Sequence, residues 1–267
     1  MAESTLSITR TDLRKAVGWF AGYGSDPTGW SDDPQKALTV EEIIKTGERS
    51  FYAPAADHQW SFLRPMLTTI VTAAGVGDYD LPDLFAGFVD QLYFSSLDNG
   101  LICHLRETGI GDILDRRQQA ANNTNGQPQL FAWHPLPQTG ETPQRYSLSF
   151  WPTPDGVYHP RGQYVVNPYH VTADNPYPMG GQPHAETLRE AVLAAAEREL
   201  NDEVGMHNAE FEKRLQASIT HDRRVSTPKF FGYNGDRSGS RRTGPPVIDR
   251  SMAPGFVTYN GNSYLGD

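Results

Sequence analysis

Two apolar stripes at helical spacing near the end of the chain constrain its fold most strongly. The first lies between residues 186 and 200 and is rich in alanine; it consists of Leu188, Ala191, Val192, Ala195, Ala196 and Leu200. The second follows Gly205, which suits a left-handed helix cap, and consists of Phe211, Leu215 and Ile219. With Pro183 at a helix start, the pattern predicts an αα-hairpin whose alanine face allows another helix to approach closely.

Two more helices are expected near the start of the chain. One covers residues 11–20, where four apolar residues recur at helical spacing: Leu13, Ala16, Val17 and Phe20. The other is expected from Val40 to Phe51, because Thr39 and Glu42 match a capping box. We therefore predict a helical bundle made of residues 1–58 and 176–224.

The intervening residues 59–175 have the alternation and β-branched content of strands. Residues 145–151 alternate most clearly, further strands are expected at 67–72 and 88–94, and residues 129–134 are apolar and aromatic. A turn at 154–156 predicts that residues 157–166 return antiparallel to 145–151. One helix is expected near 108–121. The predicted class is α+β, with an inserted antiparallel β-sandwich or barrel between helical segments.

The last part of the chain, residues 225–267, differs from the rest in composition and charge. Of these 43 residues, 19 are Gly, Pro, Ser or Asn, which predicts an extended arm without regular structure. Residues 223–267 carry a net charge of +4, leaving −13 for the remainder of a chain whose total is −9. Aromatic and arginine side chains along the arm predict that it orders on a protein partner. The candidate contact residues are Phe230, Phe231, Tyr233, Arg237, Arg241, Arg242, Arg250, Phe256, Tyr259 and Tyr264.

Catalytic and metal-binding patterns are weak throughout the sequence. Asp78 and Asp80 form a carboxylate pair, but solvation in a glycine-rich turn explains them better than acid/base chemistry. Cys103 is the single cysteine and could serve as a nucleophile only with a distant histidine. Because these patterns are weak, we predict no enzymatic activity, no cofactor and no metal. We also predict no membrane segment, since the apolar runs are short. An alternative is a carbohydrate-binding β module with Trp30, Trp133 and Trp151 as its platform.

The order of several short motifs resembles the head-to-tail adaptor proteins of tailed bacteriophages, also called connector, neck or tail-tubular gatekeeper proteins. The resemblance spans residues 39–224 and is carried by Gly77-Asp78-Tyr79-Asp80-Leu81-Pro82, Leu148-Ser149-Phe150-Trp151-Pro152, Val165-Val166-Asn167-Pro168, Thr172-Ala173-Asp174-Asn175-Pro176 and the helix Glu186 to Leu200. The large β part departs from smaller, all-helical adaptors.

This resemblance implies a virion protein at the head-tail junction, which passes through the host cytoplasm during assembly; a tail accessory protein of a virion is the alternative. It implies about twelve copies in a ring beneath the portal, joined to a tail or nozzle protein, with the C-terminal arm reaching the portal. An acidic body around the channel would let genomic DNA pass without specific binding. Because the arm would order only on its partner, we expect the isolated chain to be largely monomeric.

Overall fold

The computed structural model describes residues 4–54, 58–94, 104–119, 125–138, 140, 143–226, 256–259 and 262–265. The chain divides into two compact units, Met1–Thr227 and Pro228–Asp267. The larger unit contains two hydrophobic cores, one among the helices and one in the sheet. The mixed α+β class that we predicted is confirmed.

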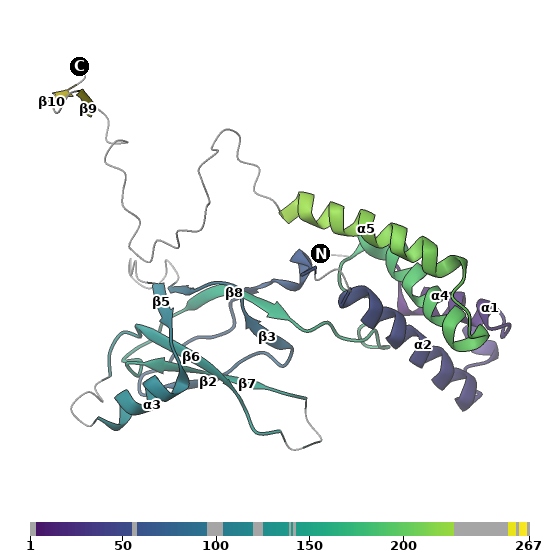
Figure 1. Ribbon diagram of the computed structural model, residues 1–267. Coiled ribbons are helices and arrows are strands. Elements are labelled where there is room, and N and C mark those ends of the chain that lie inside the picture. Colours follow the sequence, from purple (N-terminus) through teal and green to yellow (C-terminus); the bar gives the residue numbers. More distant parts are fainter. Residues whose placement is uncertain are drawn as a thin grey trace. The chain divides into compact units, whose positions relative to one another are not determined.

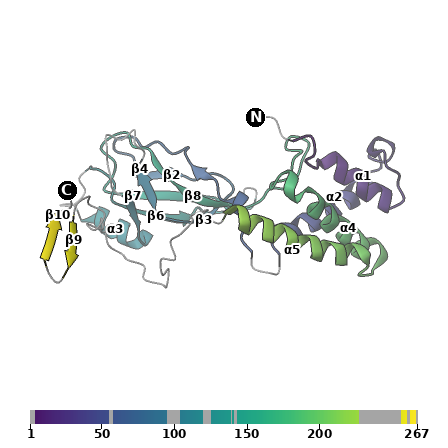
Figure 2. The same cartoon turned by 90° about the horizontal axis from the view of Figure 1, so that it is seen from above.

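Four helices form the helical group (Figures 1 and 2). They are α1 (Arg10–Phe20), α2 (Pro34–Tyr52), α4 (Ala185–Asn201) and α5 (Met206–Ser226). Helix α4 packs against each of the other three, and nearly all of its residues from Ala185 to Ala196 are buried. The predicted αα-hairpin is therefore present as α4 and α5, and Phe211, Leu215 and Ile219 are buried as expected.

Two helix boundaries differ from the sequence-based expectation. Helix α2 begins at Pro34, because the Asp33 carboxylate accepts hydrogen bonds from the backbone N–H groups of Gln35 and Lys36. Thr39 is inside this helix and donates its hydroxyl to the Gln35 carbonyl at 2.9 Å, so the capping box predicted there was wrong. Asp202, not Gly205, takes the left-handed conformation after α4, with φ of 54°.

The middle of the chain forms a curled, mixed sheet with the shape of a half-barrel (Figure 1). The strand order is β1-β8-β4-β5-β6-β7-β2, and β3 also pairs with β8. The strands are β1 (Met66–Leu67), β2 (Asp78–Asp80), β3 (Phe85–Phe88), β4 (Leu92–Phe94), β5 (His104–Glu107), β6 (Leu130–Pro135), β7 (Tyr146–Trp151) and β8 (Pro160–Val166). Helix α3 (Ile110–Gln118) packs against β6 and β7.

Three expectations about the sheet differ from the structure. The sheet is not wholly antiparallel, because β5 and β6 pair in parallel; α3 lies between these two strands in the sequence. Residues 157–166 do not return beside β7: β8 pairs with β1, β3 and β4, while β7 lies between β6 and β2. The expected strand at 67–72 is reduced to the two residues of β1. Strand β7 was located correctly, and its Leu148 and Phe150 belong to the sheet core.

In the smaller unit the structure describes one antiparallel hairpin, β9 (Phe256–Tyr259) with β10 (Asn262–Leu265). This part of the predicted arm therefore has regular structure that its composition did not indicate. A two-stranded hairpin alone is only marginally stable in water, so we expect this hairpin to be stable only when it packs against a partner.

Candidate docking site

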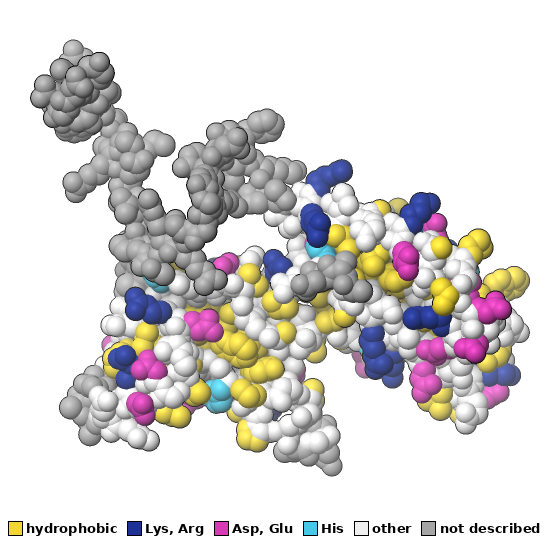
Figure 3. Space-filling model, in the orientation of Figure 1, with side chains coloured by type: hydrophobic (Ala, Val, Ile, Leu, Met, Phe, Trp, Pro, Cys, Tyr) yellow, Lys and Arg dark blue, Asp and Glu magenta, His cyan; other side chains and the backbone are white. Residues whose placement is uncertain are grey.

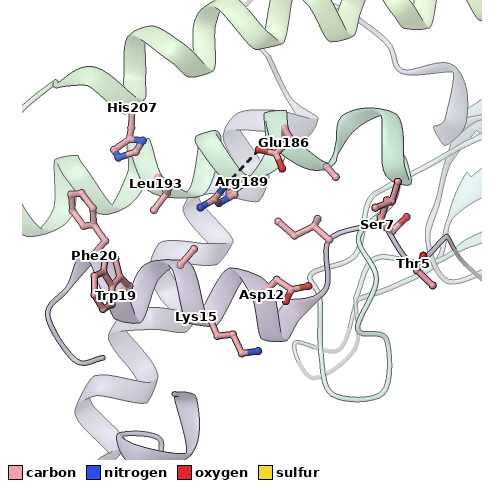
Figure 4. A pocket seen from close by; sticks show the side chains of 14 residues that line it. Thr5, Ser7, Asp12, Lys15, Trp19, Phe20, Glu186, Arg189, Leu193 and His207 are labelled. Atoms are coloured by element: carbon pink, nitrogen blue, oxygen red, sulfur yellow. Dashed lines mark ion pairs between the residues drawn. The ribbon is translucent and has the colours of Figure 1, made fainter. Parts of the chain in front are cut away.

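A surface groove of about 640 Å³ lies between α1 and α4 (Figure 4). Its other walls come from residues 5–8 before α1 and from His207 at the start of α5. We call this surface the α1/α4 groove.

The groove exists because α4 is covered on only part of its circumference. Helices α1, α2 and α5 pack against α4, and they leave open a line of residues three and four apart: Glu186, Arg189 and Leu193. Leu193 is 6% exposed and forms the floor, whereas Glu186 and Arg189 are exposed at the rim.

Three chemical zones follow one another along the groove, and both helices contribute to each (Figure 4). The apolar zone contains Trp19, Phe20 and Leu193, and Trp19 is 72% exposed. The cationic zone contains Lys15 and Arg189, and the acidic zone contains Asp12 and Glu186. An indole with this exposure carries a large apolar area that a partner could bury.

Contacts of His207 fix the end of the groove nearest the α4–α5 turn. Its Nδ1 lies 2.8 Å from Oε2 of Glu190, and its backbone N–H donates to Oε2 of Glu197 at 3.1 Å. The imidazole also meets the ring of Phe20 edge-on at 5.8 Å. These contacts join α1, α4 and α5, so the apolar zone has a rigid frame.

A polar network holds the opposite side of α1. Arg10 and Arg14 of α1 form ion pairs with Glu41 of α2, which also lies 3.4 Å from Nε2 of His170. The other imidazole nitrogen of His170 lies 2.5 Å from Oε2 of Glu48. Burial raises the pKa of the Glu48 carboxyl, and the histidine only partly offsets that effect. The network therefore ties α1 and α2 to the segment that returns from the sheet.

A second polar cluster surrounds Asp222 near the end of α5. Its carboxylate accepts from the Ser61 hydroxyl at 2.5 Å and lies 2.9 Å from Nε2 of His58. Burial would raise the pKa of Asp222, but the hydrogen bonds from Ser61 and His58 outweigh it and keep that pKa low. Serine and histidine both meet the carboxylate and not each other, so the cluster lacks the hydrogen-bond order of a catalytic triad.

Of the two carboxylates Asp78 and Asp80, only Asp78 makes contacts that hold the fold together. Asp78 lies in β2, not in a turn, and it binds the guanidinium of Arg117 at 3.1 Å and the hydroxyl of Ser149 at 2.5 Å. Partial burial alone would raise the pKa of Asp78, but the hydrogen bonds from Arg117 and Ser149 have the larger combined effect. The net result is a pKa below the ordinary value. Asp80 is exposed. Among the described residues, no group of three or more His, Cys, Asp or Glu side chains is arranged to hold a metal.

The three tryptophans of the carbohydrate alternative do not meet on one platform. Trp30 is buried in the helical core, while Trp133 packs against the core of the sheet. Trp151 lies beneath the guanidinium of Arg116, whose Cζ is 4.8 Å from the ring centre. On the face shown in Figure 3, apolar atoms gather over the sheet, and charges of both signs are interspersed over the helices.

Most of the predicted arm residues, and Cys103, lie outside the described residues. Phe256, Tyr259 and Tyr264 lie in the β9–β10 hairpin, where the register pairs Tyr259 with Asn262 and Tyr264 with Val257. The α1/α4 groove was not predicted. The signal that could have revealed it is Trp19, which lies outside the apolar stripe of its own helix.

Comparison with known proteins adds one finding. A family model described as SU10 adaptor protein matches residues 8–231, which include both hydrophobic cores and all of the α1/α4 groove except residues 5–7. A search of curated proteins found no match to the chain. In the described helices, no stretch is long and apolar enough to span a membrane.

Proposed function

We propose that this chain, which belongs to the SU10 adaptor family of phage head-tail adaptors, forms a ring that joins the portal vertex to the tail and continues the DNA channel. Membership makes the chain an adaptor protein of the phage virion and implies portal and tail partners. The family is structural and is not known to be enzymatic. The family match over residues 8–231 is the observation that carries the proposal.

The ring is proposed to contain about a dozen copies, joined by heterologous contacts in which two different faces of the subunit meet. The helical group supports this idea because it offers two dissimilar surfaces: the α1/α4 groove and the outer side of α2, where Leu38 is 58% exposed. We also propose that residues 1–58 and 176–224 form the bundle and residues 59–175 an inserted sheet unit.

The arm, residues 225–267, is proposed to bind the portal. Its basic charge opposes the acidic charge of the rest of the chain, and its arginines can bind carboxylates in bidentate fashion. The ten aromatic and arginine residues named above are its proposed contact residues. Ordering of the arm on the portal would make assembly depend on the portal being present.

The acidic body is proposed to surround the genome without binding it. Residues 1–222 carry a charge of −13, which disfavours retention of a polyanion. A gel-shift assay with duplex DNA in low salt should accordingly show no complex of a variant that ends at residue 226.

Deletion of residues 227–267 tests the role of the arm. The shortened protein should keep its helical content and melting temperature but should no longer co-sediment with portal rings from the same phage. Co-sedimentation with unchanged affinity would contradict the proposed role of the arm. Full-length protein that also fails to bind portal rings would contradict the adaptor function itself.

A further inference from the structure

The outer side of α2 carries an ordered stripe of four exposed residues. Leu38 is followed by Glu42, Lys45 and Arg49, at steps of four, three and four residues. These steps keep the side chains on one face of a helix. Read along α2, the stripe is first apolar, then acidic, then basic.

The α1/α4 groove carries the complementary order at the same steps. On α1 the sequence of zones is Trp19, Lys15, Asp12, and on α4 it is Leu193, Arg189, Glu186 (Figure 4). Each step is again four and then three residues. Both groove helices run from the acidic zone toward the apolar zone, as the labels in Figure 4 show.

We propose that α2 of one copy lies in the α1/α4 groove of the next copy, antiparallel to the two groove helices. Leu38 then meets Trp19 and Leu193, Glu42 meets Lys15 and Arg189, and Lys45 with Arg49 meets Asp12 and Glu186. This inference rests on the proposed ring function and names the contact between neighbouring subunits.

A second copy is required because α2 cannot reach the groove of its own chain. The inner face of α2 packs on α4 so closely that a Cβ at Gly47 would lie 2.5 Å from the Cα of Val192. The four residues of the stripe lie on the opposite face of α2 and are exposed. The groove and the stripe are different surfaces, so each copy can bind two neighbours, which is the condition for a ring.

Most of the charges of both surfaces are available for a partner, although the Asp12 carboxylate also accepts hydrogen bonds from the backbone N–H and the hydroxyl of Thr9. Within the described part of the chain, Lys15, Glu42, Lys45 and Arg49 take part in no ion pair, and Arg189 makes a single exposed one with Glu186 at 3.7 Å. Contact between copies would pair these groups and cover the indole of Trp19 and the side chain of Leu38.

Disulfide trapping tests the contact directly. In a full-length Cys103→Ser background, Glu42→Cys is combined with Lys15→Cys or with Arg189→Cys, and the concentrated protein is oxidised alone and on portal rings. We expect a ladder of covalent oligomers from at least one of these pairs. The matched control combines Glu42→Cys with Glu212→Cys, which places the second cysteine on the exposed face of α5. Absence of a ladder from both pairs, or an equal ladder from the control, would overturn the proposal.

Charge reversal provides an independent test, read out as the concentration at which free copies associate. Glu42→Lys alone, or Lys15→Glu with Arg189→Glu, should weaken association at least about tenfold, the change expected when an interfacial pair becomes repulsive. The triple variant restores complementary charges and should recover association to within about threefold. A triple variant as weak as either parent would contradict the pairing.

The two experiments separate this contact from the adaptor function. Portal-bound rings that give no ladder would retain the function and exclude the contact. A ladder from free protein that ignores portal rings would retain the contact and exclude the function.

Discussion

Gly47 of α2 packs directly against Val192 of α4: a Cβ added at position 47 would lie 2.5 Å from the Val192 Cα and 2.8 Å from its backbone nitrogen. Both of these atoms belong to the backbone of α4 and cannot move aside as a side chain would. The closest approach of the two central helices therefore depends on the absence of a side chain at position 47.

Gly47→Ala should destabilise the protein by about 1–3 kcal/mol, although alanine is the better helix former, because the helices must separate. Urea unfolding monitored by circular dichroism measures the change. Gly111→Ala in α3 is the matched control, since no atom lies within 4 Å of its added Cβ. The control should leave stability unchanged or raise it by up to about 1 kcal/mol. Equal effects of the two substitutions would contradict the packing argument.

Arg117 fastens α3 to the edge of the sheet. Its guanidinium donates to the carboxylate of Asp78 and to the carbonyl oxygens of Gly77 and Phe150, at 3.0–3.1 Å. Arg117→Ala removes the hydrogen bonds that this guanidinium gives to all three acceptors; Asp78 keeps the hydroxyl of Ser149, and the Gly77 carbonyl keeps the Phe150 backbone N–H. A loss of about 1–3 kcal/mol is expected in urea unfolding.

The neighbouring Arg116 is the control for that substitution. It forms an exposed i,i+4 pair with Asp112 and lies over the ring of Trp151. Arg116→Ala should cost less than about 1 kcal/mol. A loss for Arg116→Ala as large as that for Arg117→Ala would contradict the role of the Arg117 hydrogen bonds in holding α3.

His184 should make the fold sensitive to acid. Burial among Phe51, Trp60 and Phe62 lowers its pKa below the ordinary 6.5, because the charged imidazolium is poorly solvated there. A histidine with a lowered pKa in the folded state supplies stability above pH 6.5 that is lost as the pH falls through the folded pKa. His184→Phe should lessen the loss of stability between about pH 7 and pH 5.

The pH test compares unfolding free energies of the variant and the wild type at each pH. Asp222, His221 and His58 lie around His184 and are the same residues in both proteins, so the difference between the two curves reports the substitution at position 184. His104→Phe, at an exposed histidine of β5, serves as a control for substitution alone. Parallel curves for His184→Phe and the wild type would refute the role of this buried imidazole.

Helical features were the most predictable from the sequence, because their signals are local. The stripe around Ala191 and Ala195 located α4, and the alternation at Leu148 and Phe150 located β7. The start of α2 was missed because Thr39 and Glu42 match a capping box in sequence, while Asp33 and Pro34 supply the cap that forms. The sequence contains two possible helix starts, and the structure uses the one at Asp33, which comes earlier in the chain than Thr39.

Pairing between strands was less predictable, because it depends on contacts between distant residues. The turn at 154–156 suggested a hairpin, but β8 leaves β7 and pairs with strands that precede it by many residues, such as Tyr93 with Arg161. The α1/α4 groove could not be predicted for the same reason. Its zones are made by Lys15 and Arg189, which come together only when α4 packs against α1.

The mass of the intact protein by native mass spectrometry, alone and mixed with portal rings, tests the adaptor account most directly. The account predicts that free protein is mainly monomeric at low concentration and that portal rings acquire about a dozen copies. The same portal rings should acquire none of the variant lacking residues 227–267. Portal rings whose mass is unchanged by the full-length protein would contradict the central claim.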